Sequence, residues 1–184
     1  LWPDGEHLSV QIVAQSPQKI AAAAGMELPE GKTFFMVEEN DGIGPDYRFT
    51  GEKLSVVTTL IKYDTFEEAL DKLEAVLEFQ GKGHSCGIHT TDKEKVLTLA
   101  ARMPVSRITV NQPQCLANSG AWTNGLPMSM TLGCGTWGHN SISHNATWKD
   151  LLNFTYVARE IQSYQPTDED LFDNAELRAK IDNQ

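Results

Sequence analysis

Apolar positions along the chain change between strand-like runs and helix-like spacing. Five apolar or β-branched runs of strand length stand at residues 8–15, 32–39, 54–63, 84–91 and 106–112. The run at 54–63, LSVVTTLIKY, is nearly continuous in apolar and β-branched residues, which is typical of a strand buried on both faces. We therefore predict five strands, with this run as the strongest.

The clearest helix signal follows that strand. Thr65 and Glu68 have the spacing of a capping box, and apolar residues then recur at helical intervals as far as Phe79. Gly81 and Gly83 come directly afterwards. We expect a helix that begins after Thr65 and ends before these two glycines.

Two further helices are expected between the predicted strands. Ser16 and Pro17 supply an N-cap and a first-turn proline for the first of them. The second is expected at residues 92–103, with Thr91 or Asp92 as its N-cap. This alternation predicts an α/β domain with parallel crossovers and a mostly parallel sheet covered by flanking helices.

The helical period disappears from Gln112 to Asn145, where Gly, Asn, Ser and Thr dominate. This stretch is typical of a long functional loop region. A helix or strand is expected again at residues 148–161. The chain is thus divided into a main segment, residues 1–165, and an acidic tail, residues 166–184, expected to form a surface helix.

Composition narrows the class of protein. The 184 residues are 40% hydrophobic and 22% charged, as in ordinary globular segments, and their formal net charge of −10 disfavours nucleic-acid partners. No apolar run approaches the roughly 20 residues that span a bilayer, and no signal peptide opens the chain. We expect a cytoplasmic protein without membrane contact. The start at Leu1, without a methionine, is interpreted as a fragment, a processed product or a domain.

Three cysteines, Cys86, Cys115 and Cys134, are odd in number and far apart. Neither a disulfide framework nor a Cys-x-x-Cys zinc pair is present in this pattern, and no metal site is expected. Cys86 shares a predicted strand face with His84, which is the arrangement of a nucleophile and its base, but residues two apart on a strand diverge. A packed core cysteine is the alternative.

Two residues stand at the ends of predicted strands where site residues often lie. Glu52, just before the strongest strand, is suited to bind a ribose or to act as a general base; the alternative is a solvated glutamate beside Lys53. His84, at the start of another strand, is suited to proton transfer near neutral pH, and a surface histidine is the alternative.

The stretch TLGCGTWGHNSIS, residues 131–143, has its glycines at Gly133, Gly135 and Gly138. This spacing matches the G-x-G-x-x-G dinucleotide fingerprint, which also requires a preceding strand and a following helix. The residues after Gly138 do not resemble a helix start. We interpret the stretch as a glycine-rich turn near an active site, with Cys134 as a packed small residue.

Four segments in order resemble the catalytic domain of CoA-acylating aldehyde dehydrogenases. They are residues 51–70, 83–90 (GHSCGIHT), 101–113 and 124–145, the last containing GCGTWGHNSISHN. The resemblance extends from about Thr33 to the end of the chain. It includes succinate-semialdehyde enzymes and the aldehyde dehydrogenase part of bifunctional aldehyde–alcohol dehydrogenases, and it is greatest for the acylating sulfoacetaldehyde dehydrogenases.

The resemblance implies a reaction and assigns residues to it. A cysteine thiolate attacks the aldehyde, hydride passes to NAD or NADP, and the thioacyl group is transferred to coenzyme A. It implies that Glu52 contacts the nicotinamide ribose, that Leu54 packs beside the nicotinamide, and that His84 assists attack by coenzyme A. It places the nucleophilic cysteine and the nucleotide-binding domain upstream of Leu1, and it implies a homo-oligomer.

The chain departs from the family pattern at two positions. The usual form of the glycine-rich run is GCG[ST]WGGNS[IV]SEN, whereas this sequence has His139 in place of a glycine and His144 in place of the glutamate. We expect His139 to change the turn. Asn118, Ser119 and Asn124 are candidate hydrogen-bond donors to a polar substrate, or ordinary turn residues. A fold that serves only in binding or assembly remains an alternative to an enzyme.

Overall fold

The structure is a computed structural model and describes residues 1–171. The chain divides into two units, Leu1–Leu151 and Leu152–Gln184. The expected division between residues 165 and 166 stays a prediction. Within the described part of the chain, no helix is long and apolar enough to cross a membrane.

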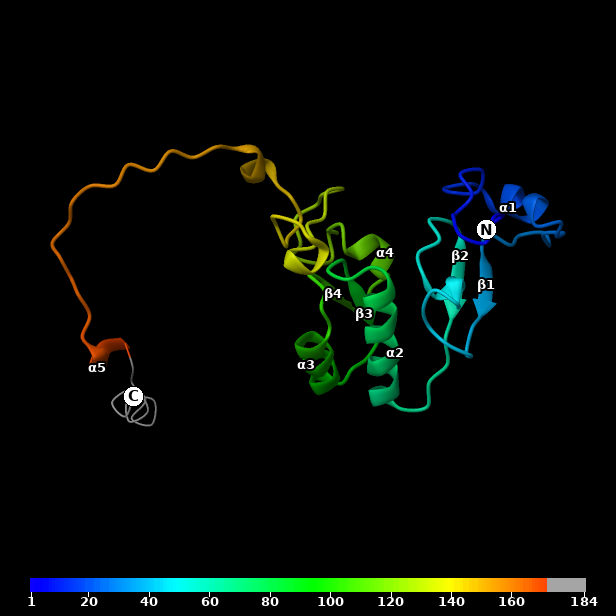
Figure 1. Ribbon diagram of the computed structural model, residues 1–184, viewed down its shortest axis with the longest axis horizontal. Helices are drawn as coiled ribbons and strands as arrows, with labels where there is room; N and C mark the ends of the chain where they lie inside the picture. The colour runs from blue at the N-terminus through cyan, green and yellow to red at the C-terminus, as the bar shows by residue number, and fades with distance from the viewer. Residues whose placement is uncertain (172–184) are drawn as a thin grey trace. The chain divides into compact units, whose positions relative to one another are not determined.

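The first of two sheets consists of parallel strands. β1 (Phe35–Glu38) pairs with β2 (Val57–Leu60), and Phe35 lies opposite Val57 (Figure 1). The short helix α1 (Pro17–Ala23) packs on the same core through Ile20. This core consists of Ile12, Ile20 and Val57, with Leu1, Phe35, Val37 and Phe49 packed against it.

Helix α1 begins where the sequence predicts. The Ser16 hydroxyl accepts a hydrogen bond from the N–H of Lys19 (3.4 Å). Pro17 occupies the first turn, where its missing N–H leaves no bond unmade. The helix ends at Ala23, and Gly25 follows with a φ of 65°.

The strand predicted at residues 8–15 is wrong, because the chain forms turns there. The N–H of Ile12 donates to the carbonyl of Ser9 (3.1 Å), and the N–H of Ala14 donates to the carbonyl of Leu54 (2.8 Å). A strand needs a neighbouring strand to form hydrogen bonds with its backbone N–H and carbonyl groups. In this segment, those groups are bonded largely within local turns. The apolar pattern predicts burial correctly, since Ile12 is 4% exposed. It does not predict the backbone conformation of the segment.

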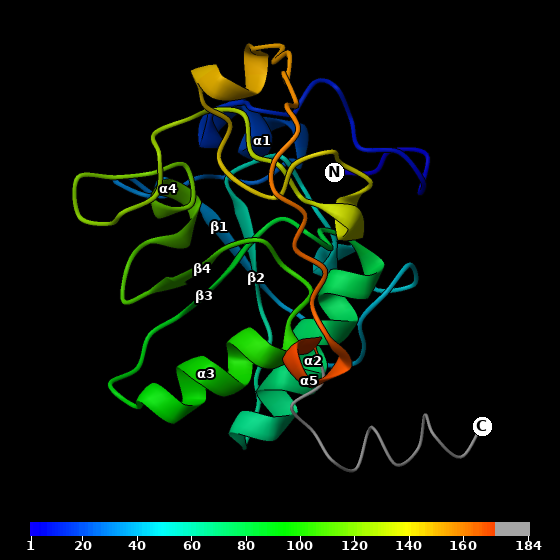
Figure 2. The same ribbon diagram turned by 90° about the vertical axis from the view of Figure 1, so that its left-hand side faces the viewer.

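A second parallel pair forms the other sheet. β3 (Cys86–Ile88) pairs with β4 (Ile108–Val110). Helices α2 (Phe66–Phe79) and α3 (Lys93–Arg102) lie close to this pair in both views (Figure 1, Figure 2). They share its core, whose buried members are Leu70, Leu77, Cys86, Leu99, Met103 and Val105.

The caps of both long helices agree with the sequence. The Thr65 hydroxyl accepts a hydrogen bond from the N–H of Glu68 (3.2 Å). The Glu68 carboxylate reaches the N–H of Asp64 (2.7 Å), one residue earlier than a standard capping box. Of the two candidate caps for α3, Asp92 is used, since it accepts from the N–H of Glu94 (3.0 Å).

The parallel α/β class is confirmed, whereas the expected single sheet is wrong. Among the described residues, the strands form two separate two-stranded sheets, and each strand is shorter than its apolar run. An apolar run predicts that a segment is buried. It does not determine which strand becomes its neighbour, because pairing depends on contacts between residues that are distant in the sequence.

The segment from Gln112 to Asn145 is mostly loop, as predicted. It contains only the short helix α4 (Gln114–Ala117) and the 3-10 turn η2 (Thr136–Gly138). It nevertheless contributes two of the most buried polar side chains, Asn118 and Asn145.

The regular element predicted at residues 148–161 is limited to the 3-10 turn η3 (Trp148–Leu151). Residues 152–167 form neither helix nor strand, so the prediction is wrong there. The helix α5 (Asp168–Leu171) coincides with the start of the predicted tail helix, whose remaining residues lie outside the described part of the chain.

Candidate active site

Two motifs that are distant in the sequence meet at Gly83. This glycine has a φ of 86°, and a Cβ atom placed on it would lie 2.5 Å from the carbonyl oxygen of Cys134 and 2.8 Å from the nitrogen of Gly138. Both neighbours are backbone atoms, which have no freedom to rotate away. Only glycine therefore allows the strand start at residues 83–85 to approach the glycine-rich turn so closely.

The turn itself is closed by its own backbone and by Asn140. Oδ1 of Asn140 accepts from the main-chain N–H of Cys134 (2.9 Å), and the main-chain N–H of Asn140 donates to the carbonyl of Gly135 (2.8 Å). Cys134 is half-buried here, as expected of a packed residue. His139 ends η2 with a φ of 57°, a left-handed conformation that glycine adopts without cost.

A buried arginine, which is not among the predicted site residues, connects these motifs. Nη2 of Arg107 donates to the carbonyl oxygens of His84 (3.1 Å) and Gly133 (2.7 Å), and Nη1 donates to Oδ1 of Asn145 (3.3 Å). The side chain is only 4% exposed. An arginine inside an apolar run was the available signal, because an unpaired buried charge is costly and needs bonding partners.

Asn145 completes this buried set. It is 1% exposed, and its Nδ2 donates to the carbonyls of Asn118 (2.9 Å) and Pro127 (2.8 Å). Through Asn145, the loop at 112–145 is bonded to Arg107 and so to the start of β3. Sequence alone offered no signal for Asn145, which reads as an ordinary loop residue.

His84, predicted to be catalytic, is exposed and lies two residues before β3, and its carbonyl is the one bonded by Arg107. Nδ1 of its ring is 2.6 Å from the hydroxyl of Ser85. Burial of the ring lowers the pKa of His84, and the positive charge of Arg107 lowers it further, while the carboxylate of Glu52 opposes both. The environment therefore favours the neutral imidazole.

Glu52, the other predicted site residue, lies in the loop between the 3-10 turn η1 (Arg48–Thr50) and β2. Its N–H donates to Oε1 of Gln80 (2.6 Å), at the end of α2, and its carboxylate is exposed. The negative charge of this carboxylate raises the pKa of His84, and it is the smallest of the three influences on that pKa.

Lys53 fixes the same loop from inside. Its Nζ donates to the carbonyls of Phe49 (2.6 Å) and Gly51 (2.8 Å), and burial lowers the pKa of the amine. Leu54 follows with a φ of 44° and a side chain that is 53% exposed. The loop thus presents an acid and an apolar side chain two residues apart on a backbone held from both sides.

The amide side chains considered as substrate donors are already used within the protein. Nδ2 of Asn124 donates to Oε1 of Gln112 (3.0 Å) and to the carbonyl of Ala117 (3.1 Å). Asn118 is 6% exposed and bonds the hydroxyl of Ser85 (3.2 Å). Both residues organise the loop, as in the alternative of ordinary turn residues.

The cysteines do not form a reactive centre. Burial raises the pKa of Cys86 to about 11, so its thiol is protonated at neutral pH. Cys115 is exposed, on α4. Across residues 1–171, no group of three or more His, Cys, Asp and Glu side chains is arranged to hold a metal ion.

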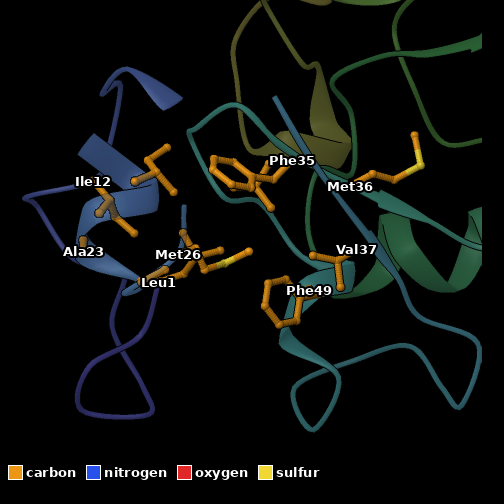
Figure 3. A pocket seen from close by; sticks show the side chains of 11 residues that line it. Leu1, Ile12, Ala23, Met26, Phe35, Met36, Val37 and Phe49 are labelled. Atoms are coloured by element: carbon orange, nitrogen blue, oxygen red, sulfur yellow. The ribbon is translucent and has the colours of Figure 1, made fainter. Parts of the chain in front are cut away.

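One apolar pocket of about 250 Å³ lies over the first sheet. Figure 3 shows Leu1 and Met26 on one side of it and Phe35 and Phe49 on the other. The residues that line it do not include Glu52 or His84. It therefore belongs to the small core around α1 and not to the candidate active site.

Comparison with known proteins identifies the class. The chain is 42% identical over 161 residues to a sulfoacetaldehyde dehydrogenase of Acholeplasma sp, covering 88% of this chain and 33% of that protein. It is 38% identical over 172 residues to the acylating sulfoacetaldehyde dehydrogenase of Cupriavidus necator, covering 93% and 35%. It is 40% identical over 157 residues to the acetylating succinate-semialdehyde dehydrogenase of Clostridium kluyveri, covering 85% and 34%. The chain spans about a third of the length of these curated relatives.

Solved structures agree. An acetylating aldehyde dehydrogenase from Geobacillus thermoglucosidasius matches with a TM-score of 0.76 and 34% identity over 88% of this chain and 36% of that chain. A probable aldehyde dehydrogenase from Listeria monocytogenes matches with a TM-score of 0.78 and 34% identity over 84% and 34%. No family model matches the chain. The fold is that of an aldehyde dehydrogenase. In sequence, the chain is similar to about a third of the length of acylating aldehyde dehydrogenases.

Proposed function

We propose that this chain is the catalytic-domain segment of a CoA-acylating aldehyde dehydrogenase that acts on sulfoacetaldehyde in the cytoplasm. The overall reaction converts the aldehyde, coenzyme A and NAD(P)+ into acyl-CoA, NAD(P)H and a proton. The observation that carries the proposal is the joining of the family motifs around Gly83, Cys134 and Arg107. The relatives named for sulfoacetaldehyde, at 38% and 42% identity, support that substrate.

The loop that holds Glu52 and Leu54 fits a nicotinamide nucleotide. The Glu52 carboxylate is exposed and accepts hydrogen bonds only, so it suits the hydroxyls of a ribose. Leu54 offers an exposed apolar surface two residues away. When bound, the nucleotide supplies the hydride acceptor. The bond from the N–H of Glu52 to Gln80 limits the motion of the acid and so keeps it in position.

His84 is the proposed group that assists transfer of the acyl group to coenzyme A. Its ring is partly exposed, and the lowered pKa keeps it neutral under ordinary conditions. The nucleophilic cysteine is not assigned to Cys86, whose pKa is raised. We assign it, following the family resemblance, to a part of the enzyme outside these 184 residues. Homo-oligomer formation and the absence of nucleic-acid partners stay predictions.

The test is an assay of the protein encoded by the complete open reading frame. Sulfoacetaldehyde, succinate semialdehyde and acetaldehyde are supplied with NAD+ or NADP+, with and without coenzyme A. We expect NAD(P)H formation to require coenzyme A, with sulfoacetyl-CoA as the product of the best substrate. Oxidation to the free acid without coenzyme A would contradict the acylating assignment.

The same assay separates the substrates. A higher kcat/KM for succinate semialdehyde would transfer the proposal to the substrate named for the Clostridium kluyveri relative. No oxidation of any aldehyde, by a protein that is folded, would favour a binding or assembly role.

A further inference from the structure

Three nitrogen atoms surround the hydroxyl oxygen of Ser85. Nδ1 of His84 lies 2.6 Å from it, Nε2 of Gln114 lies 2.6 Å from it, and Nδ2 of Asn118 lies 3.2 Å from it. Ser85 stands between the exposed imidazole and the loop that begins with α4. The three contacts together determine where the protons of this cluster lie.

A serine hydroxyl donates one hydrogen bond and accepts two. Amide nitrogens only donate, so Gln114 and Asn118 occupy both acceptor positions of the oxygen. The one hydrogen of Ser85 is then left for Nδ1 of His84. A nitrogen that accepts this hydrogen bond carries no proton of its own.

The orientation of the Gln114 amide is set by a further contact. Nε2 of Gln114 also lies 3.4 Å from the main-chain carbonyl of Ser85, which can only accept, so the amide nitrogen and not the oxygen faces Ser85. In Asn118, Nδ2 faces Ser85 while Oδ1 accepts from the hydroxyl of Ser119 (3.2 Å). Asn118 is 6% exposed and has no room to turn freely.

We propose that Ser85, held by Gln114 and Asn118, is a positioning residue that fixes His84 as the neutral tautomer with its proton on Nε2. The role of this tautomer in the reaction rests on the proposed function. In that reaction, the thiol of coenzyme A releases its proton to solvent, and its sulfur forms a bond to the acyl carbon while Nε2–H donates a hydrogen bond to the acyl oxygen. The bond from that carbon to the sulfur of the enzyme cysteine then breaks, and the cysteine leaves as a thiolate. His84 does not remove the thiol proton at Nε2, because that nitrogen already carries one.

Nuclear magnetic resonance tests the tautomer directly. The protein is labelled with ¹⁵N-histidine, and long-range ¹H–¹⁵N correlations are recorded at a pH well above the ordinary histidine pKa of 6.5. His84→Gln identifies the His84 signals by their loss. We expect the pattern of a single tautomer protonated at Nε2. A ring protonated at Nδ1 would overturn the proposal.

Variants of Ser85 separate positioning from simple support of the fold. Ser85→Ala is expected to give a mixture of the two tautomers, and Ser85→Thr, which keeps the hydroxyl, is expected to restore the single pattern. An unchanged pattern in Ser85→Ala would overturn the proposal. Gln114→Met, which frees one acceptor position of the hydroxyl, is expected to allow the Nδ1-protonated ring as well. A pattern unchanged in Gln114→Met would contradict the saturation of Ser85.

These spectra are independent of activity. If the Nε2-protonated tautomer is found in a protein without CoA-dependent oxidation, the proposed function fails while the positioning role stands. If CoA-dependent oxidation is found with an Nδ1-protonated ring, the positioning role fails and the proposed function stands.

Discussion

Nη2 of Arg107 donates a hydrogen bond to the main-chain carbonyl of His84 across 3.1 Å, and the same nitrogen donates to Gly133 across 2.7 Å. A single buried cation therefore joins the start of β3 to the glycine-rich turn. It also places a positive charge near the imidazole of His84, whose pKa it helps to lower. Arg107 thus contributes both to the geometry and to the electrostatics of the candidate active site.

Arg107→Met tests this structural role. The substitution leaves two main-chain carbonyls and Oδ1 of Asn145 without their donor, so we expect a loss of about 3 kcal/mol in the free energy of unfolding. Urea denaturation measures it. Arg159→Met makes the same change at an exposed position and should alter stability by less than about 0.5 kcal/mol. Similar losses in both variants would show that burial of Arg107 contributes nothing.

The pH dependence of stability follows from His84. Its folded pKa is lowered by burial first and by Arg107 second, so the unfolded chain binds more protons at pH values below 6.5 and above the folded pKa. The free energy of unfolding should therefore fall as the pH is lowered through 6.5. Denaturation curves of the wild type and of His84→Gln are recorded over a range of pH. The wild type should lose free energy of unfolding below pH 6.5 relative to His84→Gln, and the gap between the two proteins should be constant at higher pH.

The same titration can be shifted by the neighbouring charges. Glu52→Gln removes the negative charge that opposes the lowering, so the midpoint of His84 in a proton NMR titration should fall further. An unchanged midpoint in Glu52→Gln would show that the two residues do not share one electrostatic environment.

Gly83→Ala tests the close approach of the two motifs. A left-handed φ costs alanine about 1 kcal/mol, and contact with the backbone of Cys134 and Gly138 should add about 1–3 kcal/mol. Gly31 has a similar φ of 77° with no atom within 4 Å of a Cβ, so Gly31→Ala isolates the first cost. Thermal or urea unfolding of both variants compares them. Equal losses would contradict a close approach at Gly83.

His139 is the position where this sequence departs from the glycine of the family pattern. Because His139 holds a φ of 57°, His139→Gly should raise the free energy of unfolding by about 0.5–1 kcal/mol. This net gain is the backbone strain that glycine relieves, reduced by the larger conformational entropy that glycine loses on folding. His139→Ala keeps the strain and should bring no gain. A gain of equal size from alanine would assign the effect to loss of the ring and not to the backbone.

Local signals predicted the helices well and the sheets poorly. The caps at Ser16, Thr65 and Asp92 depend on contacts within a few residues, so sequence spacing was enough to find them. Strand pairing depends on partners far along the chain. For that reason the apolar pattern predicts a strand at residues 8–15 where the chain forms turns, and it predicts one sheet where the described strands form two.

The residues of the candidate site also fall into two groups, those that the sequence predicts and those that only the folded chain reveals. Glu52 and His84 stand in recognisable motifs, which is why the sequence predicts them as site residues, and their roles stay predictions. Arg107 and Asn145 act through backbone carbonyls in other segments, and the chemistry of an acceptor carbonyl does not depend on the residue that carries it. Only the folded chain reveals which carbonyls converge on these two side chains.

Reactivity of the thiols distinguishes a core cysteine at position 86 from a nucleophile. Burial raises the pKa of Cys86 to about 11, which leaves roughly one molecule in ten thousand as thiolate at pH 7. A maleimide or disulfide reagent should therefore modify the exposed Cys115 first and Cys86 only in urea, as peptide mass spectrometry would show. Cys115→Ser should remove the fast phase and leave the slow one. Rapid modification of Cys86 in the folded protein would revive the alternative of a Cys86–His84 nucleophile, because that chemistry requires an accessible thiol whose proton a neutral imidazole takes up.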